Sequence, residues 1–314
     1  MLTRYDDLIH SAKEISRSRK QPVRVAVAGG HDLAALQALN EAWKMGLTQP
    51  ILVGLPEQID ASLQQISPDM KSGLQIEPVT NAEEIAARAV ALARDGQAEI
   101  VLKGKVKTAV LLKAVLDKTA GMRSGSLISD VVVVEHPKEK RFLLITDGGV
   151  NLAPNLMQKI PIIENAVLVA HALGIVEPKV AVLSAIEVVN PNLSSTIDAA
   201  VLSQMNRRGQ IANCIVDGPL AFDNAISTEA AEEKEIVSPV AGLADILVCP
   251  NIESASIFAK SLTYLAHLPL AHICIGAKVP VLIPSRADTA HAKLISLALS
   301  LVVSDFVRTS GFIL

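Results

Sequence analysis

The stretch Val23-Arg-Val-Ala-Val-Ala-Gly-Gly30, which leads into a helical pattern from about Asp32 to Lys44, decides the fold class. Its first six residues are the short, mostly apolar run that forms a buried strand. The two glycines that follow favour a tight turn. The sequence therefore predicts a strand that is joined directly to a helix.

The same succession of strand and helix repeats along the first third of the chain. Ile51–Val53 and Ile100–Leu102 are apolar runs that predict further strands. Between them, Asn81 and Glu84 have the spacing of a helix-capping box, and Gly96 stands where that helix should end. This order predicts a parallel sheet with helices on both faces.

The middle of the chain departs from this order at one point. Val131–Val134 and Phe142–Ile145 flank the polar turn His136–Lys140, which predicts an antiparallel hairpin. Beyond it the alternation resumes, with predicted helices near 158–173, 195–208, 253–267 and 289–303 and predicted strands at 179–183, 246–248, 273–275 and 279–283.

Length and composition favour two globular α/β domains. The chain has 314 residues, which exceeds the size at which a single core usually stops growing. Half of the residues are hydrophobic and 19% are charged, which excludes a disordered chain. Aromatic residues make up only 3%, so the core must be built from Ala, Val, Ile and Leu, as in buried parallel strands covered by helices.

Charge and cysteine content restrict the partners and the compartment. The 29 basic and 32 acidic residues give a net charge of −3 without a basic block, which argues against nucleic acid but allows a small anionic ligand. Cys214, Cys249 and Cys274 lie singly in apolar runs, as buried thiols of a reducing compartment do. The N-terminus lacks the apolar centre of a signal peptide, and the apolar stretch Leu294–Val303 is too short to cross a bilayer. We therefore expect a cytoplasmic protein with no membrane partner.

Two glycine-containing loops follow predicted strands. Gly29-Gly30 lacks the third glycine of a dinucleotide-binding fingerprint, so a plain turn is favoured. Lys103-Gly104-Lys105-Val106-Lys107-Thr108 opens a helix and combines glycine with three lysines, which suits a phosphate-bearing ligand as well as it suits a solvated basic turn. Arg123 could add a bidentate phosphate contact.

Two further loops carry polar side chains. Thr146-Asp-Gly-Gly-Val-Asn-Leu-Ala-Pro154, with Asp147 and Asn151, either gathers a ligand at a strand end or is a structural turn. Ser285-Arg286-Ala287-Asp288 precedes the last helix. It could bind an oxyanion or phosphate with Asp288 as a base, but Asp288 could also simply cap the helix. No histidine has metal-ligand spacing and no G-x-S-x-G motif occurs, so we expect neither a metal site nor a serine triad.

Several of these segments together resemble one family. They are 146–154, Asp217-Gly-Pro-Leu-Ala-Phe-Asp223, Cys249-Pro-Asn-Ile-Glu-Ser254, and Ser285-Arg-Ala-Asp288 followed by Lys293. In order and spacing they resemble the phosphate acetyl/butyryltransferases, most closely the butyryltransferase branch. The resemblance extends over nearly the whole chain, from about Val23 to Ser300.

This resemblance implies a two-lobed α/β/α fold of the isocitrate/isopropylmalate-dehydrogenase type, with a cleft between the lobes. The first domain would comprise residues 1–127 and 278–314, and the second residues 128–277. The implied reaction moves a short acyl group reversibly between coenzyme A and inorganic phosphate, by direct attack of the thiol on acyl phosphate. Acyl-CoA is then a substrate and no cofactor is bound. Homodimers or larger homo-oligomers are expected.

The resemblance also implies roles for individual residues. Asp288 would be the base, Ser285 a donor to the developing charge and Arg286 the anchor of the phosphoryl group, with His291 as an alternative base. The loop is shorter here than in the acetyltransferases, and Lys113 stands where they have an arginine. The predicted substrate-binding residues are Lys103, Gly104, Lys105, Thr108, Lys113, Arg123, Asp147 and Asn151. The alternatives are a phosphate acetyltransferase and a non-catalytic protein that binds acyl-CoA.

Overall fold

The computed structural model describes residues 1–19, 21–66 and 74–311, and the chain forms two compact units. The split unit comprises Tyr5–Ser126 and Ala271–Leu314, and the middle unit comprises Met1–Arg4 and Leu127–Leu270. Both units are built from strands and helices, which confirms the predicted α/β class. The predicted domain boundaries and the cleft stay predictions.

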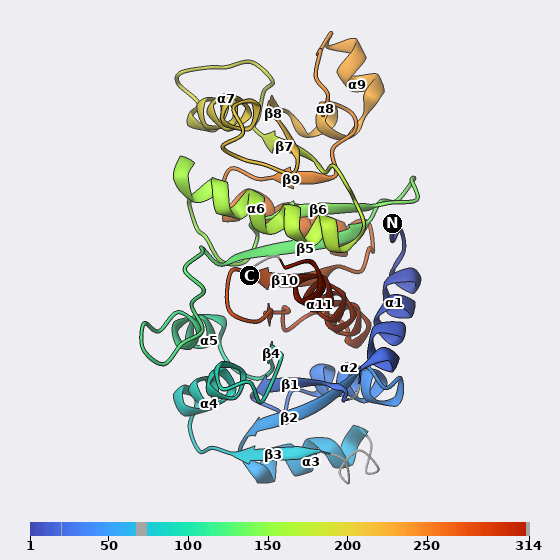
Figure 1. The fold of residues 1–314 in the computed structure, drawn as a ribbon, viewed down its shortest axis with the longest axis vertical. Helices are drawn as coiled ribbons and strands as arrows, with labels where there is room; N and C mark the ends of the chain where they lie inside the picture. Colours follow the sequence, from blue (N-terminus) through green and yellow to red (C-terminus); the bar gives the residue numbers. More distant parts are fainter. Residues whose placement is uncertain (20, 67–73, 312–314) are drawn as a thin grey trace. The chain divides into compact units, whose positions relative to one another are not determined.

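Three adjacent parallel strands lie at the centre of the split unit (Figure 1). They are β1 (Val23–Ala28), β4 (Ile100–Lys103) and β11 (Val281–Leu282), and Leu102 pairs with Val27 on one side and with Leu282 on the other. The sheet of this unit runs β3-β2-β1-β4-β11-β10, with β2 at Thr48–Gly54, β3 at Gln75–Pro78 and the antiparallel β10 at Ala271–Ile275. The carboxyl ends of β1, β4 and β11 therefore lie at one edge.

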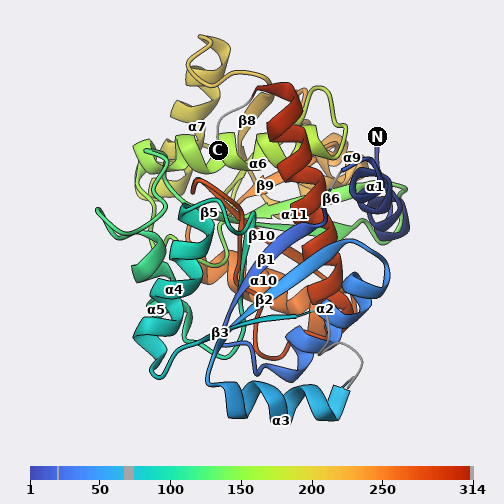
Figure 2. The same cartoon turned by 60° about the horizontal axis from the view of Figure 1, so that its bottom comes forward.

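The helices of the split unit form two sets, which lie on either side of its strands (Figure 2). One set packs around α11 (Ala290–Ser310) and contains α1 (Tyr5–Ser18), α2 (Leu33–Lys44) and α3 (Pro56–Ile66). The other set is α4 (Ala82–Arg94) with α5 (Thr108–Val115). Asn81 caps α4 by accepting from the Glu84 N–H at 2.8 Å, and Gly96 follows its end at φ +73°, as the sequence predicts.

Helix α11 is the longest helix of the described residues and the most deeply buried. By length and composition alone its 21 residues could cross a membrane, because the helix is longer than the apolar stretch Leu294–Val303 that the sequence argument considered. All residues from Ala292 to Val303 are buried. Packing against α1, α2 and the sheet accounts for their apolar character, as in the core helix of a globular domain.

The middle unit has its own sheet, in the order β5-β6-β9-β7-β8. Its strands are β5 (Ser129–Glu135), β6 (Phe142–Thr146), β7 (Lys179–Leu183), β8 (Ile215–Leu220) and β9 (Ile246–Val248), and its helices are α6 (Leu156–Ala172), α7 (Ser194–Arg207), α8 (Phe222–Ile226), α9 (Thr228–Glu233) and α10 (Ile252–Tyr264). Aliphatic side chains from these strands and from α8, α9 and α10 form its core.

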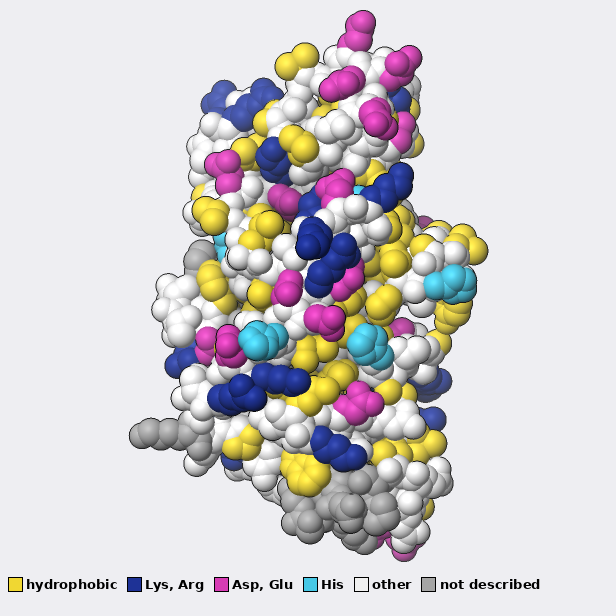
Figure 3. Space-filling view, turned by 90° about the vertical axis from the view of Figure 1, so that its right-hand side faces the viewer, with side chains coloured by type: hydrophobic (Ala, Val, Ile, Leu, Met, Phe, Trp, Pro, Cys, Tyr) yellow, Lys and Arg dark blue, Asp and Glu magenta, His cyan; other side chains and the backbone are white. Residues whose placement is uncertain are grey.

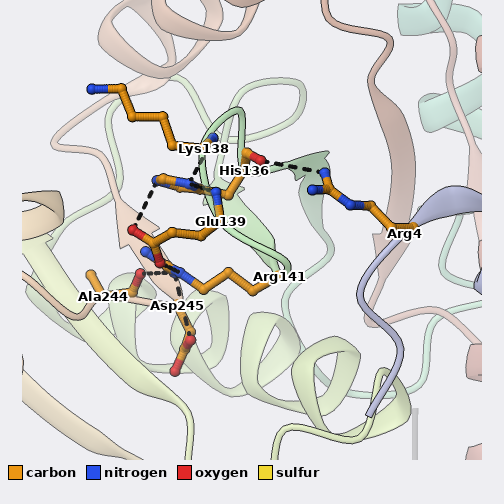
Figure 4. Close-up of polar contacts among 7 residues, drawn as sticks. All are labelled: Arg4, His136, Lys138, Glu139, Arg141, Ala244 and Asp245. Carbon is orange, nitrogen blue, oxygen red and sulfur yellow. Dashed lines mark hydrogen bonds and ion pairs between the residues drawn. The ribbon is translucent and has the colours of Figure 1, made fainter.

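Strands β5 and β6 pair antiparallel, which confirms the predicted hairpin. Figure 4 shows how its turn is held. Nδ1 of the buried His136 accepts the N–H groups of Glu139 at 3.0 Å and Lys138 at 3.4 Å. Arg141 donates to the carbonyl oxygen of Ala244 at 2.8 Å. Burial, and next the charge of Arg141, lower the pKa of His136, so the ring stays neutral and serves as an acceptor.

Candidate active site

The carboxyl ends of β1, β4 and β11 bring three chemically active loops to one edge of the split unit's sheet. His31 and Asp32 follow β1, Lys103 ends β4, and the Ser285–Asp288 loop follows β11. Strand ends at such an edge are where α/β proteins gather their ligands. The structure thus joins two segments that lie far apart in the sequence.

Lys103 is a buried cation at this edge. Lys103 is only 5% exposed. Among the described residues, 1–19, 21–66 and 74–311, its ammonium has no hydrogen-bond or ion-pair partner. Burial lowers its pKa; the positive charges of Lys293 and Arg286 lower it further, and Asp32 and Asp288 oppose this. A buried charge without a partner is costly. Such a group is suited to an anion that enters the site.

The structure explains why glycine occupies position 104, which the sequence did not reveal. Its N–H donates to the carbonyl of Ala28 and the N–H of Lys105 donates to that of Gly29, both at 2.9 Å. A Cβ at position 104 would lie 2.3 Å from the Gly29 oxygen. The two loops therefore need glycine to touch, and these two N–H groups are already satisfied by protein carbonyls.

The Gly29-Gly30 pair is a tight turn, as predicted. Both N–H groups donate to the carbonyl of Val53, at 3.0 and 3.1 Å. They are therefore occupied within the sheet.

The remaining predicted residues of the basic loop and its helix lie toward solvent. Lys105 and Lys113 are exposed, and Thr108 is the first residue of α5. Lys113 lines a cavity of about 340 Å³ together with Ala109 and Val110. Arg123 is exposed and forms an isolated antiparallel β-bridge with Ala277. Ala277 precedes the start of β11, whereas Ser285 follows its end, so the two residues flank opposite ends of this strand. Their contacts with substrate stay predictions.

A larger cavity, of about 630 Å³, lies between α4 and α5. Its two arginines are already paired: Arg88 with Glu77 at 3.0 Å, and Arg94 with Asp95 at 2.8 Å. Because both guanidinium groups already have carboxylate partners, this cavity is less suited to bind an anion than the strand edge with Lys103.

The Ser285–Asp288 loop is a closed turn. The N–H of Asp288 donates to the Ser285 carbonyl at 3.2 Å, and the Ser285 N–H donates to Oδ2 of Asp288 at 2.7 Å. Helix α11 is capped by Thr289, whose hydroxyl accepts from the Ala292 N–H at 3.2 Å. The alternative that Asp288 caps the helix is therefore wrong. Its carboxylate closes the turn instead.

Arg286 occupies a central position of this turn and is exposed. Within the described part of the chain its guanidinium has no hydrogen bond or ion pair. The hydroxyl of Ser285 accepts from the Ala287 N–H at 3.4 Å, which leaves its own hydrogen available for donation. His291 is exposed in the first turn of α11. The loop thus presents a cation and a hydroxyl donor.

Asp147 and Asn151 belong to the middle unit and hold their own loop together. Asp147 is 3% exposed and accepts N–H groups from Gly149, Val150 and Asn151. The Asn151 amide donates to the Asp147 carboxylate at 2.6 Å and to the Ile128 carbonyl at 2.8 Å. Burial, and next the nearby Asp130, raise the pKa of Asp147. These bonds favour the structural interpretation of the loop, and a contact with substrate stays a prediction.

Sequence reasoning assigned no role to two charged residues at the edge, Asp32 and Lys293, although Lys293 is part of a segment that carries the family resemblance. Asp32 caps α2 by accepting from the Ala35 N–H at 2.9 Å, and its charge raises the pKa of both Lys103 and Lys293. The position of Asp32 after a strand could have indicated it. Lys293 is buried in α11, and only the packing of this helix brings it to the edge.

The fold and this edge define an α/β protein with two cations, Lys103 and Arg286, at the carboxyl ends of its strands. A family model described as "Phosphate acetyl/butaryl transferase" matches residues 71–301. The chain belongs to this family of acyltransferases. Among the described residues, no group of His, Cys, Asp or Glu side chains is arranged to hold a metal ion.

Individual relatives agree with the family. The chain is 42% identical to a phosphate butyryltransferase of Clostridium acetobutylicum over 304 residues, which cover 97% of this chain and 99% of the relative. It is 43% identical to a phosphate acetyltransferase of Thermotoga maritima over 291 residues, which cover 92% and 98%. The crystal structure of a branched-chain phosphotransacylase from Enterococcus faecalis V583 superposes with a TM-score of 0.79 at 33% identity, and the match covers 90% and 99% of the two chains.

Proposed function

We propose that the chain catalyses reversible transfer of a short acyl group, butyryl or a similar chain, between coenzyme A and inorganic phosphate. The observation that carries the proposal is the pair of unpartnered cations at one strand edge, exposed Arg286 and buried Lys103, beside the Ser285 hydroxyl. Such a pair suits the phosphoryl group that acyl phosphate and inorganic phosphate share.

In the direction of acyl-CoA synthesis, the thiol sulfur of CoA attacks the carbonyl carbon of acyl phosphate. A C–S bond forms, the C–O bond to the phosphoryl group breaks, and phosphate leaves with that oxygen. Arg286 and Lys103 hold the phosphoryl oxygens, so the charge on the leaving phosphate meets cations already in place. Ser285 donates its hydroxyl hydrogen to the developing charge. The reverse direction uses the same contacts.

A base assists because a free thiol is only a few per cent thiolate at neutral pH. Asp288 is the proposed base, and the proton that it takes from the thiol passes to the departing phosphate. Its Oδ2 is held by the Ser285 N–H at 2.7 Å, which orients the carboxylate within the turn. Closing the turn and accepting a proton thus use one side chain.

The test is a coupled measurement of CoA release from butyryl-, isobutyryl- and acetyl-CoA with inorganic phosphate. We expect phosphate-dependent release with butyryl-CoA, and loss of most of it in Arg286→Ala. Arg208→Ala, which changes an exposed arginine outside the site, should behave as wild type. Full activity of Arg286→Ala would remove Arg286 from the site.

The same assay separates the alternatives. Preference for acetyl-CoA would make the chain a phosphate acetyltransferase, and binding of acyl-CoA without turnover would make it a non-catalytic relative. One methylene changes binding by only about 1–3 kcal/mol, so the whole series of acyl chains is needed.

We further propose that the protein acts in the cytoplasm as a homodimer or larger homo-oligomer, without nucleic acid or membrane partners. All three cysteines are free thiols, as suits a reducing compartment. On the face drawn in Figure 3, positive and negative side chains are interspersed without a broad basic patch. Light scattering on the purified protein tests the assembly.

A further inference from the structure

Lys293 is a buried lysine whose hydrogen bonds go to the main chain. It is 2% exposed and lies in the first turn of α11. Its ammonium donates to the carbonyl oxygen of Ser285 at 3.1 Å and to that of Asp288 at 2.8 Å. Buried lysines are usually paired with a carboxylate. Here the partners are instead the first and last carbonyls of one four-residue turn.

The turn has few other restraints. Its ends are joined by the Asp288 N–H to the Ser285 carbonyl, and by the Ser285 N–H to the Asp288 carboxylate. The two central residues, Arg286 and Ala287, are exposed. The Arg286 guanidinium has no partner among the described residues. Its side chain is therefore directed only by the backbone conformation of the turn.

Helix α11 gives this contact a rigid base. Residues Ala292 to Val303 are all buried, so the backbone of Lys293 is fixed by the core of the split unit. A charged donor that reaches from this base to both ends of the turn ties an exposed loop to the best-packed helix.

We propose that Lys293 is a positioning residue, which holds the Ser285–Asp288 turn in the shape that places Arg286 on the phosphoryl group. The role of Arg286 rests on the proposed function, whereas the clamp on the turn does not. Burial lowers the pKa of Lys293, while the charges of Asp288 and then Asp32 oppose this.

The kinetic test uses Lys293→Met, which keeps the length of the side chain and removes its donors. We expect kcat/KM for phosphate to fall about 100-fold, as small displacements of a binding group do. The KM for acyl-CoA should stay close to the wild-type value. In an Arg286→Ala background the same substitution should cost little more, because both changes remove one interaction. Additive losses would show that Lys293 does not act through Arg286.

Lys159→Met is the matched control. Lys159 is also a buried helical lysine, 4% exposed, but it pairs with Asp198 in the middle unit. Its loss should lower the thermal unfolding temperature without changing kcat/KM for phosphate. If Lys293→Met behaves in the same way, the positioning role is overturned.

Hydrogen–deuterium exchange tests the clamp without any assay of activity. Amides of Ser285, Ala287 and Asp288 are hydrogen-bonded within the turn. In Lys293→Met a peptide covering 283–292 should exchange faster, and in Lys159→Met at the wild-type rate. Unchanged exchange in Lys293→Met overturns the inference. A wild-type protein without phosphate-dependent turnover overturns the proposed function instead.

Discussion

Replacing Lys103 by Met should weaken phosphate binding and leave the fold as stable or more stable. Lys103 is 5% exposed and has no partner in the described ranges, and the charges that lower its pKa include those of Lys293 and Arg286. Met has a similar volume and no charge, so it removes a desolvation penalty of about 1–3 kcal/mol. We expect the unfolding temperature to rise by a few degrees, or not to fall.

The effect on binding has the opposite sign. A hydrogen bond from a charged donor contributes about 1.5–3 kcal/mol. Its loss should raise the KM for phosphate roughly 10- to 150-fold at a rate of tenfold per 1.4 kcal/mol. The assay is phosphate-dependent CoA release at saturating acyl-CoA, with differential scanning calorimetry on the same samples. Lys118→Met, which changes an exposed lysine of the same unit, is the control.

The pairing of these two results is what makes the prediction strict. A drop in stability together with unchanged KM would refute the reasoning, since Lys103 would then have a structural partner and no ligand. The expected result, higher stability with a higher KM, would show that stability and phosphate binding are opposed at position 103, as they often are at binding sites.

Three further changes test other parts of the site. Asp288→Asn keeps an acceptor for the Ser285 N–H, so stability should hold while kcat falls about 10²- to 10⁴-fold; unchanged kcat by steady-state kinetics would place the base elsewhere. Gly104→Ala sets a Cβ 2.3 Å from a carbonyl oxygen and should cost about 1–3 kcal/mol or more in urea unfolding, whereas Gly148→Ala meets only ordinary contacts; equal costs would contradict the close approach. Finally, burial lowers the pKa of Lys103 from its usual 10.5, so the KM for phosphate should rise as pH passes upward through that lowered pKa. Over the interval from the lowered pKa to 10.5 the unfolded chain keeps the proton that the folded chain has lost at Lys103, so the contribution of this lysine to stability should rise there. Burial lowers the pKa of Lys293 as well, so in Lys103→Met the KM trend should vanish while the stability trend should shrink without vanishing. A KM trend that persists in Lys103→Met would assign it to another group.

Periodicity predicted most of the architecture because apolar runs report burial directly. Val23–Ala28, Lys179–Leu183 and Ile246–Val248 form strands with the predicted bounds. Two short or polar strands were not predicted. Strand β3 (Gln75–Pro78) has only half-buried and exposed residues, and β8 contains Asp217, Gly218 and Pro219. Such strands depend on neighbours in the sheet more than on their own pattern.

The resemblance supplied the residues of the candidate site, and their roles stay predictions; the local contacts of these residues were not predictable where tertiary structure decides them. Thr289 and Asp288 are both good capping residues, and sequence position could not choose between them. Likewise, Gly104 looked like a residue for a phosphate, and only the approach of Gly29 shows what its missing side chain makes room for. Both outcomes depend on contacts that the local sequence does not contain.

The split unit also has a consequence for synthesis on the ribosome. The middle unit, Leu127–Leu270, leaves the ribosome as one continuous segment and can fold as it emerges, as domains generally do. The sheet edge with Lys103 can be completed only later, because β11 and α11 are translated after the whole middle unit. Until then the apolar faces of α1 and α2 that α11 covers stay open to chaperones or to other nascent chains. A ribosome that stalls between residues 104 and 285 would release a chain with Lys103 but without Arg286, and under the proposed function such a product would lack one of the two cations proposed to bind the phosphoryl group.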